Sequence, residues 1–323
     1  MLVLIAAPAL AADLPIRAMR WVASDSNQVR VLTRTPAECL THSSVAIEIG
    51  RAAFRSPLLL GGQAARAGLS CDSCHRNGRG NPDFHFPGLS GAPGTADVTS
   101  SLFSRKRGDG TDNPKPIPDL AIAPHKVAAR DLPTFITGQI VEEFDGAPPP
   151  PAVITGLAAY VAALQPSACP AGDTAVTATS TANDARRAVA AAKQSLIAGD
   201  PATAAAMILA ARSQLGLLDE RFPAARPRAA LRAADADLAA VLAKIRANDP
   251  RATKSLQQWQ DNAPNWQRLI AATEAQSLFN PARLAAALPA TTPPHPGTTP
   301  ALAPDSRTET PPPSASGSLP TPR

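Results

Sequence analysis

The sequence predicts a mainly α-helical protein. Apolar side chains recur at helical spacing in residues 45–53 and again in 153–164, and residues 183–287 are rich in alanine and carry several such stripes. The chain has 323 residues, enough for two modest domains or for one domain with appendages. Its 35 prolines are about twice the ordinary share, so we expect parts of the chain to stay outside a packed core.

The first eleven residues, 1–11, have the apolar character of a secretory signal. Ala9-Leu10-Ala11 fits the small-residue cleavage pattern and predicts a mature start near Ala12, although the charged residues that usually come first are missing. A buried first helix is the alternative. Because this run and every later apolar run is too short to span a bilayer, we expect an exported, periplasmic protein with no transmembrane segment.

Residues 12–42 are predicted to form an N-terminal extension with a small β-hairpin. Residues 16–22 and 28–32 resemble two short strands, and the Ser-Asp-Ser-Asn sequence between them is typical of a turn. The main domain is expected to begin with a helix that Ser43 or Ser44 caps.

This main domain, residues 43–170, should contain a long stretch without regular structure. Residues 75–124 are dense in glycine, proline, aspartate and asparagine, and helices are predicted on their C-terminal side at 132–144 and 152–164. A loop of that length is uncommon in a compact domain. A cofactor that served as part of the core would allow the loop to wrap around it.

The remaining chain divides by composition into three segments. Residues 171–182 are rich in alanine, threonine and serine and are interpreted as a linker. Residues 183–287 form a predicted helical domain, in which Asp200-Pro201 begins a new helix and Pro264 breaks the last one. Residues 288–323 are mostly proline, threonine and serine and are predicted to be a disordered tail.

Residues 71–75 read Cys-Asp-Ser-Cys-His, the C-x-x-C-H pattern that attaches a c-type haem. Cys71 and Cys74 would each bond one vinyl group of the macrocycle, and His75 would be the proximal iron ligand. The alternatives are that the same two cysteines form a redox dithiol or half of a zinc site. Export favours haem, because this haem is attached on the outer side of the bacterial cytoplasmic membrane. The single motif predicts one haem c.

Two further cysteines, Cys39 and Cys169, lie on either side of the main domain. In an oxidising compartment such a pair suggests a disulfide that joins the ends of the domain. If the effect is entropic, closing a loop of about 130 residues would add about 4–5 kcal/mol to the free energy of unfolding. Two buried free thiols are the alternative.

The sequence around the motif resembles two related groups of haem proteins. Residues 157–164 resemble the C-terminal helix of class I cytochromes c, which packs across the N-terminal helix beside the haem. Residues 48–59 with 68–75 resemble the first haem domain of the bacterial dihaem cytochrome c peroxidase/MauG family, in which G-x-x-L-F-x-D-P-x-L-S precedes S-C-x-x-C-H. The resemblance covers residues 46–165 loosely and implies a cytochrome c-like haem domain with long loops.

The family's peroxidase activity does not follow from this resemblance. Those enzymes need two haems, whereas this chain has one C-x-x-C-H motif, and its alanine-rich helices contain neither cysteine nor histidine. We therefore expect an electron carrier with no catalytic residues, in which haem transfers single electrons. The alternative is a peroxidase-like or ligand-activating haem protein with an open iron site.

The second axial ligand of the iron is left open by the sequence. Class I carriers usually provide a methionine before their last helix, but Met1, Met19 and Met207 all lie elsewhere. His125, fifty residues after the proximal ligand, is slightly preferred over His85, and an iron with no second protein ligand is the third possibility.

The formal net charge of +5 is spread along the chain. Because no long run of lysine and arginine is present, nucleic acid is not expected as a partner. The expected partner is a redox protein, and the helical domain is a candidate docking module for a second protein.

Overall fold

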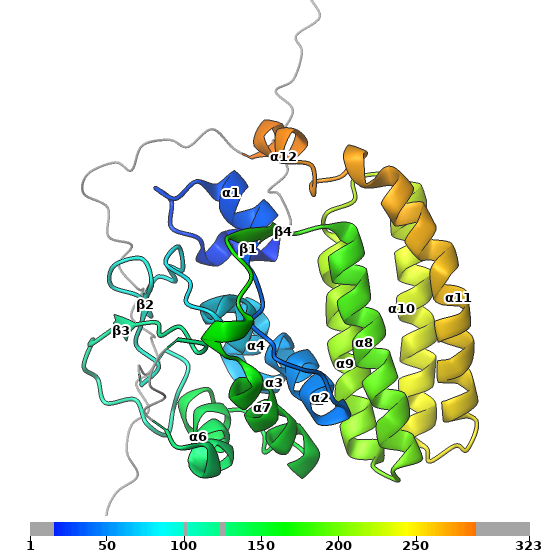
Figure 1. Ribbon diagram of the computed structural model, residues 1–323, viewed down its shortest axis with the longest axis horizontal. Helices are drawn as coiled ribbons and strands as arrows, with labels where there is room; N and C mark the ends of the chain where they lie inside the picture. Colours follow the sequence, from blue (N-terminus) through cyan, green and yellow to red (C-terminus); the bar gives the residue numbers. More distant parts are fainter. Residues whose placement is uncertain (1–15, 100–101, 123–126, 289–323) are drawn as a thin grey trace, which may run out of the picture. The chain divides into compact units, whose positions relative to one another are not determined.

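The computed structural model is mainly helical (Figure 1). It describes three segments of the chain: 16–99, 102–122 and 127–288. The predicted signal peptide, His125 and the predicted tail from residue 289 onward lie outside the described residues. Within the described segments, no helix combines the length and the apolar character needed to cross a membrane.

Two helices, α2 (Val45–Phe54) and α7 (Pro151–Ala163), cross at very short range. As predicted, a serine caps α2: the side chain of Ser44 accepts a hydrogen bond from the Ile47 amide. Pro151, at the first position, opens α7. Gly50 and Gly156 face each other at the crossing. A Cβ atom placed on Gly50 would overlap the carbonyl oxygen of Gly156, so only glycine allows the two backbones to approach this closely.

The chain between these two helices consists of short elements: α3 (Pro57–Leu60), α4 (Gly62–Ala67), α5 (Cys71–Cys74), η2 (Arg76–Gly78), β2 (Thr95–Ala96), β3 (Lys115–Pro116), η3 (Ala129–Asp131), α6 (Leu132–Gly138) and η4 (Gln139–Glu143). The described part of 75–124 holds only the η2 turn and the β2–β3 pair, so its loop-rich character is confirmed. The predicted helix 132–144 is also confirmed, and η4 gives its last turn π-helical spacing.

The predicted β-hairpin in the N-terminal extension is wrong. The structure has a 3₁₀-helix, η1 (Arg17–Trp21), followed by a short α-helix, α1 (Gln28–Thr33). The Asn27 side chain accepts a hydrogen bond from the first turn of α1 and so starts a helix instead of a turn between strands. Leu32 then packs against the C-terminal helix α12 (Pro281–Ala287), a distant contact that outweighs the local strand preference.

The two ends of the predicted haem domain are held together. β1 (Arg34–Pro36) pairs antiparallel with β4 (Asp173–Ala175). Close to this pair, Cys39 and Cys169 form the predicted disulfide, which spans 130 residues of sequence. The short turn η5 (Pro166–Ala168) leads into the second cysteine. The entry and exit of this part of the chain therefore lie side by side.

Residues 171–182 are not the free linker that their composition suggested. They contain β4, which satisfies the backbone groups of β1. They also contain the first turn of α8 (Ala178–Ile197), where the side chain of Thr177 accepts a hydrogen bond from the Ser180 amide. Small polar residues serve here as a helix cap instead of a flexible connection.

The C-terminal half contains four long helices that stand side by side (Figure 1): α8, α9 (Pro201–Asp219), α10 (Ala225–Arg246) and α11 (Ala252–Thr273). Consecutive helices pack on each other, and α11 also packs on α8, which closes a four-helix bundle. Asp200 caps α9 as predicted. The turn η6 (Glu274–Gln276) follows α11 and precedes α12.

The predicted break at Pro264 is wrong, because α11 continues through it. Pro264 lies on the exposed side of the helix, where water can take the hydrogen bond of the carbonyl that loses its partner. The opposite side carries a continuous buried stripe of Trp259, Ala263, Trp266 and Ile270. Packing of this stripe keeps the helix in one piece.

The α2 helix also joins the predicted haem domain to the bundle. One side of α2 packs on α7, and the helix contacts α8 and α9 as well. Its charged side chains on the bundle side therefore leave water when the chain folds.

We expect Gly50→Ala to destabilise the fold strongly. The added methyl group must push α2 and α7 apart, and overpacking of this kind costs about 1–3 kcal/mol or more. Gly138→Ala is the matched control, because Gly138 has helical dihedral angles and a Cβ there meets no atom within 4 Å. In urea unfolding, the free energy of unfolding should fall for Gly50→Ala. For Gly138→Ala it should stay the same or rise by about 0.5–1 kcal/mol. Equal stability of the two variants would contradict the crossing.

Candidate functional site

The C-x-x-C-H motif forms a single helical turn, α5, followed directly by the histidine. The Ser73 hydroxyl accepts a hydrogen bond from the Ser70 amide at 3.0 Å, and the His75 amide donates to the Cys71 carbonyl at 2.8 Å. Cys71 and Cys74 are three positions apart in this turn, so their side chains leave it on the same side. The structure thus brings together the three residues that the motif predicted.

The His75 ring is held by a backbone carbonyl. Its Nδ1 lies 3.0 Å from the carbonyl oxygen of Pro118. Because a carbonyl only accepts, Nδ1 must carry the hydrogen, and in the neutral ring Nε2 then keeps a free lone pair. Burial lowers the pKa of His75, against the opposing effect of this hydrogen bond, and so favours the neutral ring. The Phe54 ring lies 6.5 Å from the imidazole, centroid to centroid.

Both thiols of the motif are kept protonated. Burial, together with the nearby charge of Asp72, raises the pKa of Cys71 to about 12. Burial also raises the pKa of Cys74. The two sulfurs are not joined to each other in the structure. They are therefore poor nucleophiles in this environment, since the reactive form of cysteine is the thiolate.

The two residues between the cysteines, Asp72 and Ser73, make hydrogen bonds to the turn that follows the motif. The Asp72 carboxylate accepts a hydrogen bond from the Asn77 amide at 2.8 Å, and the Asn81 side chain donates to the Ser73 carbonyl at 2.8 Å. Asn77 has a positive φ of 52°, a conformation that asparagine tolerates better than most residues. These contacts fix the turn after the motif, and they place Asp72 beside a network of charged groups.

At the centre of that network lies Glu38, which accepts hydrogen bonds from three side chains. Arg51 Nε lies 2.9 and 3.0 Å from its two carboxylate oxygens, Arg55 donates at 2.7 Å, and the Tyr160 hydroxyl donates at 2.8 Å. The phenol ring of Tyr160 packs 5.1 Å from the ring of Phe54, measured between centroids. The network therefore connects the segment before α2 with α2 itself and with α7.

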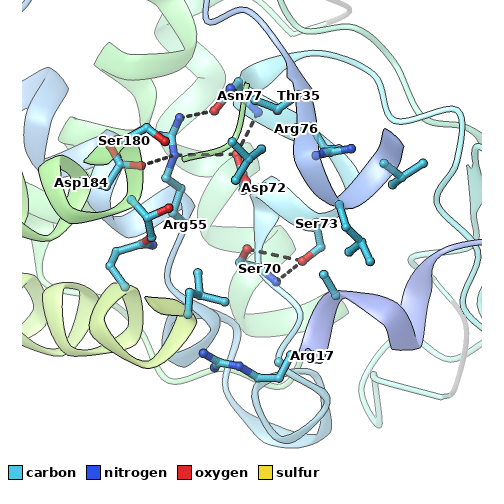
Figure 2. A pocket seen from close by; sticks show the side chains of 18 of the residues that line it. Arg17, Thr35, Arg55, Ser70, Asp72, Ser73, Arg76, Asn77, Ser180 and Asp184 are labelled. Atoms are coloured by element: carbon cyan, nitrogen blue, oxygen red, sulfur yellow. Dashed lines mark hydrogen bonds and ion pairs between the residues drawn. The ribbon is translucent and has the colours of Figure 1, made fainter. Parts of the chain in front are cut away.

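Arg55 extends the network to the motif and to the bundle (Figure 2). Its guanidinium donates to the Asn77 side chain at 2.6 Å and lies 3.9 Å from Asp72. On the bundle side, Asp184 of α8 lies 3.7 Å from Arg55 and 2.5 Å from Arg51. A further ion pair between Glu48 and Arg187 also joins α2 to α8.

Of the two sequence-predicted candidates for the second axial ligand, only His85 lies within the described residues, and it makes no contact with the motif histidine there. The His85 amide donates to the Trp21 carbonyl at 3.0 Å, and within the described segments no hydrogen bond or ring contact joins His85 to His75. His125 lies outside the described residues. Among the described residues, no group of three or more histidine, cysteine, aspartate or glutamate side chains is placed to hold a metal ion.

Sequence reasoning missed Pro118 and the Glu38 network. Pro118 lies 43 residues after His75 in a stretch without periodicity, and nothing local to it indicates a partner. Arg51 and Arg55 did carry a signal. They are four positions apart on a helix whose other side is apolar, and they are followed closely by the motif. That spacing is compatible with two arginines that share one carboxylate.

No family model, curated protein or solved structure matches the chain. The function therefore has to be argued from the residues of the site.

We expect the Glu38 carboxylate to make stability depend on acid pH. Burial alone would raise the pKa of Glu38, but the charges and hydrogen bonds of Arg55 and Arg51 lower it from 4.5 to about 2. Because the pKa is lower in the folded state, its stabilising effect is present above about pH 4.5 and is lost as the pH falls toward 2. This single group should contribute about 3 kcal/mol over that interval.

Urea unfolding of the wild type and of Glu38→Gln at pH 6 and near pH 2.5 measures this contribution. At pH 6 the variant should be less stable by about 3–5 kcal/mol, because Arg51 and Arg55 lose their shared partner. Near pH 2.5 the difference between the two proteins should shrink markedly. A difference that is the same at both pH values would show that Glu38 is not held ionised by the arginines.

Proposed function

We propose that this chain is an exported monohaem c-type cytochrome that transfers single electrons. Cys71 and Cys74 would hold the haem through thioether bonds, and His75 would be the proximal iron ligand. When bound, the haem would supply the reversible one-electron chemistry of its iron. The partners would be a redox protein and, for the helical bundle, a second protein that docks there.

The contact between His75 and Pro118 carries this proposal. An iron-ligating histidine needs a neutral ring with a free lone pair on one nitrogen, and it usually donates its other N–H to a carbonyl or carboxylate. The Nδ1–Pro118 hydrogen bond of 3.0 Å supplies that arrangement. It also fixes the orientation of the ring.

The crossing of α2 and α7 supports the resemblance to class I cytochromes c, whose terminal helices pack across each other beside the haem. Here Gly50 meets Gly156 at the crossing. Four residues further along each helix, Phe54 meets Tyr160, and Phe54 lies next to His75. The two helices and the proximal histidine thus form one continuous packed unit.

The state of the thiols argues against a redox dithiol. Such sites depend on a thiolate whose pKa is lowered by a helix N-terminus or a nearby cation. Here burial raises the pKa values of both Cys71 and Cys74, and the negative charge of Asp72 raises that of Cys71 further. Covalent attachment to haem does not require a lowered pKa in the finished protein.

The disulfide between Cys39 and Cys169 is compatible with the proposed export, because such bonds persist in oxidising compartments. The periplasm is such a compartment, and it is also where a c-type haem is attached.

We expect covalent haem on the full chain when it is produced with haem-attachment machinery. A pyridine haemochrome assay on denatured, solvent-extracted protein should report one haem per chain, because thioether bonds survive extraction. The double variant Cys71→Ser/Cys74→Ser should carry none. The matched control, Cys39→Ser/Cys169→Ser, should keep its haem while losing about 4–5 kcal/mol of unfolding free energy. Wild-type protein without covalent haem would overturn the proposal.

The visible spectrum of the haem-loaded chain then separates the electron carrier from its alternative. A six-coordinate, low-spin spectrum in both oxidation states supports a shuttle. A high-spin spectrum together with rapid turnover of hydrogen peroxide would contradict the electron carrier and support the peroxidase-like function. His75→Ala should abolish the wild-type spectrum in either case.

A further inference from the structure

A polar cavity of about 390 Å³ lies on the side of α5 that the cysteines do not use. Asp72, Ser73 and Arg76 line it, whereas Cys71, Cys74 and His75 do not. The opposite wall comes from α8 and α9 of the bundle, and η1 and α1 contribute further wall. In Figure 2, Arg17 lies at one end of the drawn site, and Asp184 and Ser180 lie across from Ser70, Ser73 and Asp72. The volume is in the range of small-molecule sites.

The side chains that line the cavity carry more positive than negative charges. Among the described residues that line the cavity, five arginines face four carboxylates. Arg51 and Arg55 are bound to Glu38 and Asp184 in the network that surrounds the motif. At the other end, Arg17 pairs with Glu220 at 3.1 Å.

Arg76 and Arg221 are left without a carboxylate partner within the described segments. The Arg76 side chain makes one hydrogen bond, to the Arg34 carbonyl at 2.7 Å. Arg221 is 8% exposed; its guanidinium lies over the Phe279 ring, 4.9 Å from the centroid, and its side chain has one long hydrogen bond, 3.4 Å, to the Leu278 carbonyl. A guanidinium has five N–H donors, so most donors of Arg76 and Arg221 have no acceptor among the described residues.

The Arg221 guanidinium is in an unfavourable setting. Burial lowers its pKa to about 10, the positive charge of Arg76 adds to that shift, and the neighbouring carboxylate of Glu220 opposes it. Buried cations normally have an anionic partner, because an unpaired charge in the interior is costly. An anion bound beside these two groups would offset the free-energy cost of leaving their charges unpaired.

We propose that this cavity binds a small organic anion, whose carboxylate or phosphate group is held by Arg76 and Arg221. The fork of N–H groups on each arginine suits the paired oxygens of either anion. The rest of the ligand would contact an apolar part of the wall, which includes Trp21, Leu32 and Leu217. The proposal concerns the face of α5 turned away from the cysteines and does not depend on whether haem is attached.

Calorimetric titration of the full chain with three small aromatic probes tests this proposal. Benzoate presents a carboxylate, phenyl phosphate presents a phosphate, and benzamide has the shape of benzoate without its charge. We expect at least one anionic probe to bind, and to bind at least ten-fold more tightly than benzamide. The stronger of the two anions identifies which oxyanion the site prefers.

Arg76→Gln and Arg221→Gln should each weaken binding of the preferred probe by at least ten-fold. Arg186→Gln is the control, because Arg186 is an exposed arginine of α8 that does not line the cavity, and it should bind as the wild type does. If the buried Arg221 variant does not fold, Arg76→Gln decides the question, since Arg76 is only half-buried. No binding of either anion, equal binding of benzamide, or unchanged binding by Arg76→Gln would each overturn the proposal.

Discussion

The pairing of Arg51 and Arg55 with Glu38 is the interaction on which the rest of the structure depends. Both arginines are almost fully buried, at 8% and 7% exposure, because α2 packs on α7 and also contacts the bundle. Their charges can be tolerated there only if carboxylates come with them. Glu38 arrives from the segment before α2, Asp72 from the motif and Asp184 from α8. Each of these segments is thereby fixed in position relative to α2.

This arrangement gives α5 two distinct sides. On one side, the cysteines and His75 lie close to Phe54 and to the packed crossing of α2 and α7. On the other, Asp72 and Arg76 face a cavity lined by charged side chains and shared with the bundle. A four-residue helix is too short to shield the two sides from each other. A change of charge on one side will therefore be felt on the other, since Coulomb interactions over such distances are only weakly screened inside a protein.

Features with a local cause could be predicted from the sequence. The caps at Ser44 and Asp200 both depend on neighbours within four residues. The failures occurred where distant contacts decided the outcome. Residues 28–33 became helical because of Asn27 and the packing on α12, and α11 passed through Pro264 because its buried stripe continues on both sides. Pro118 and Glu38 could not be assigned to the site, because only the folded chain brings them to it.

The disulfide between Cys39 and Cys169 has a consequence for how the protein survives damage. The loop-rich stretch around residues 79–114 lies between these two cysteines in the sequence, and exposed loops are where proteases cut most readily. A single cut there would divide the backbone into two pieces, but the sulfur bridge would still hold both in one molecule. The nicked protein would migrate as an intact chain until a reductant was added. A protein with such a loop is thus protected against the loss of half of its fold.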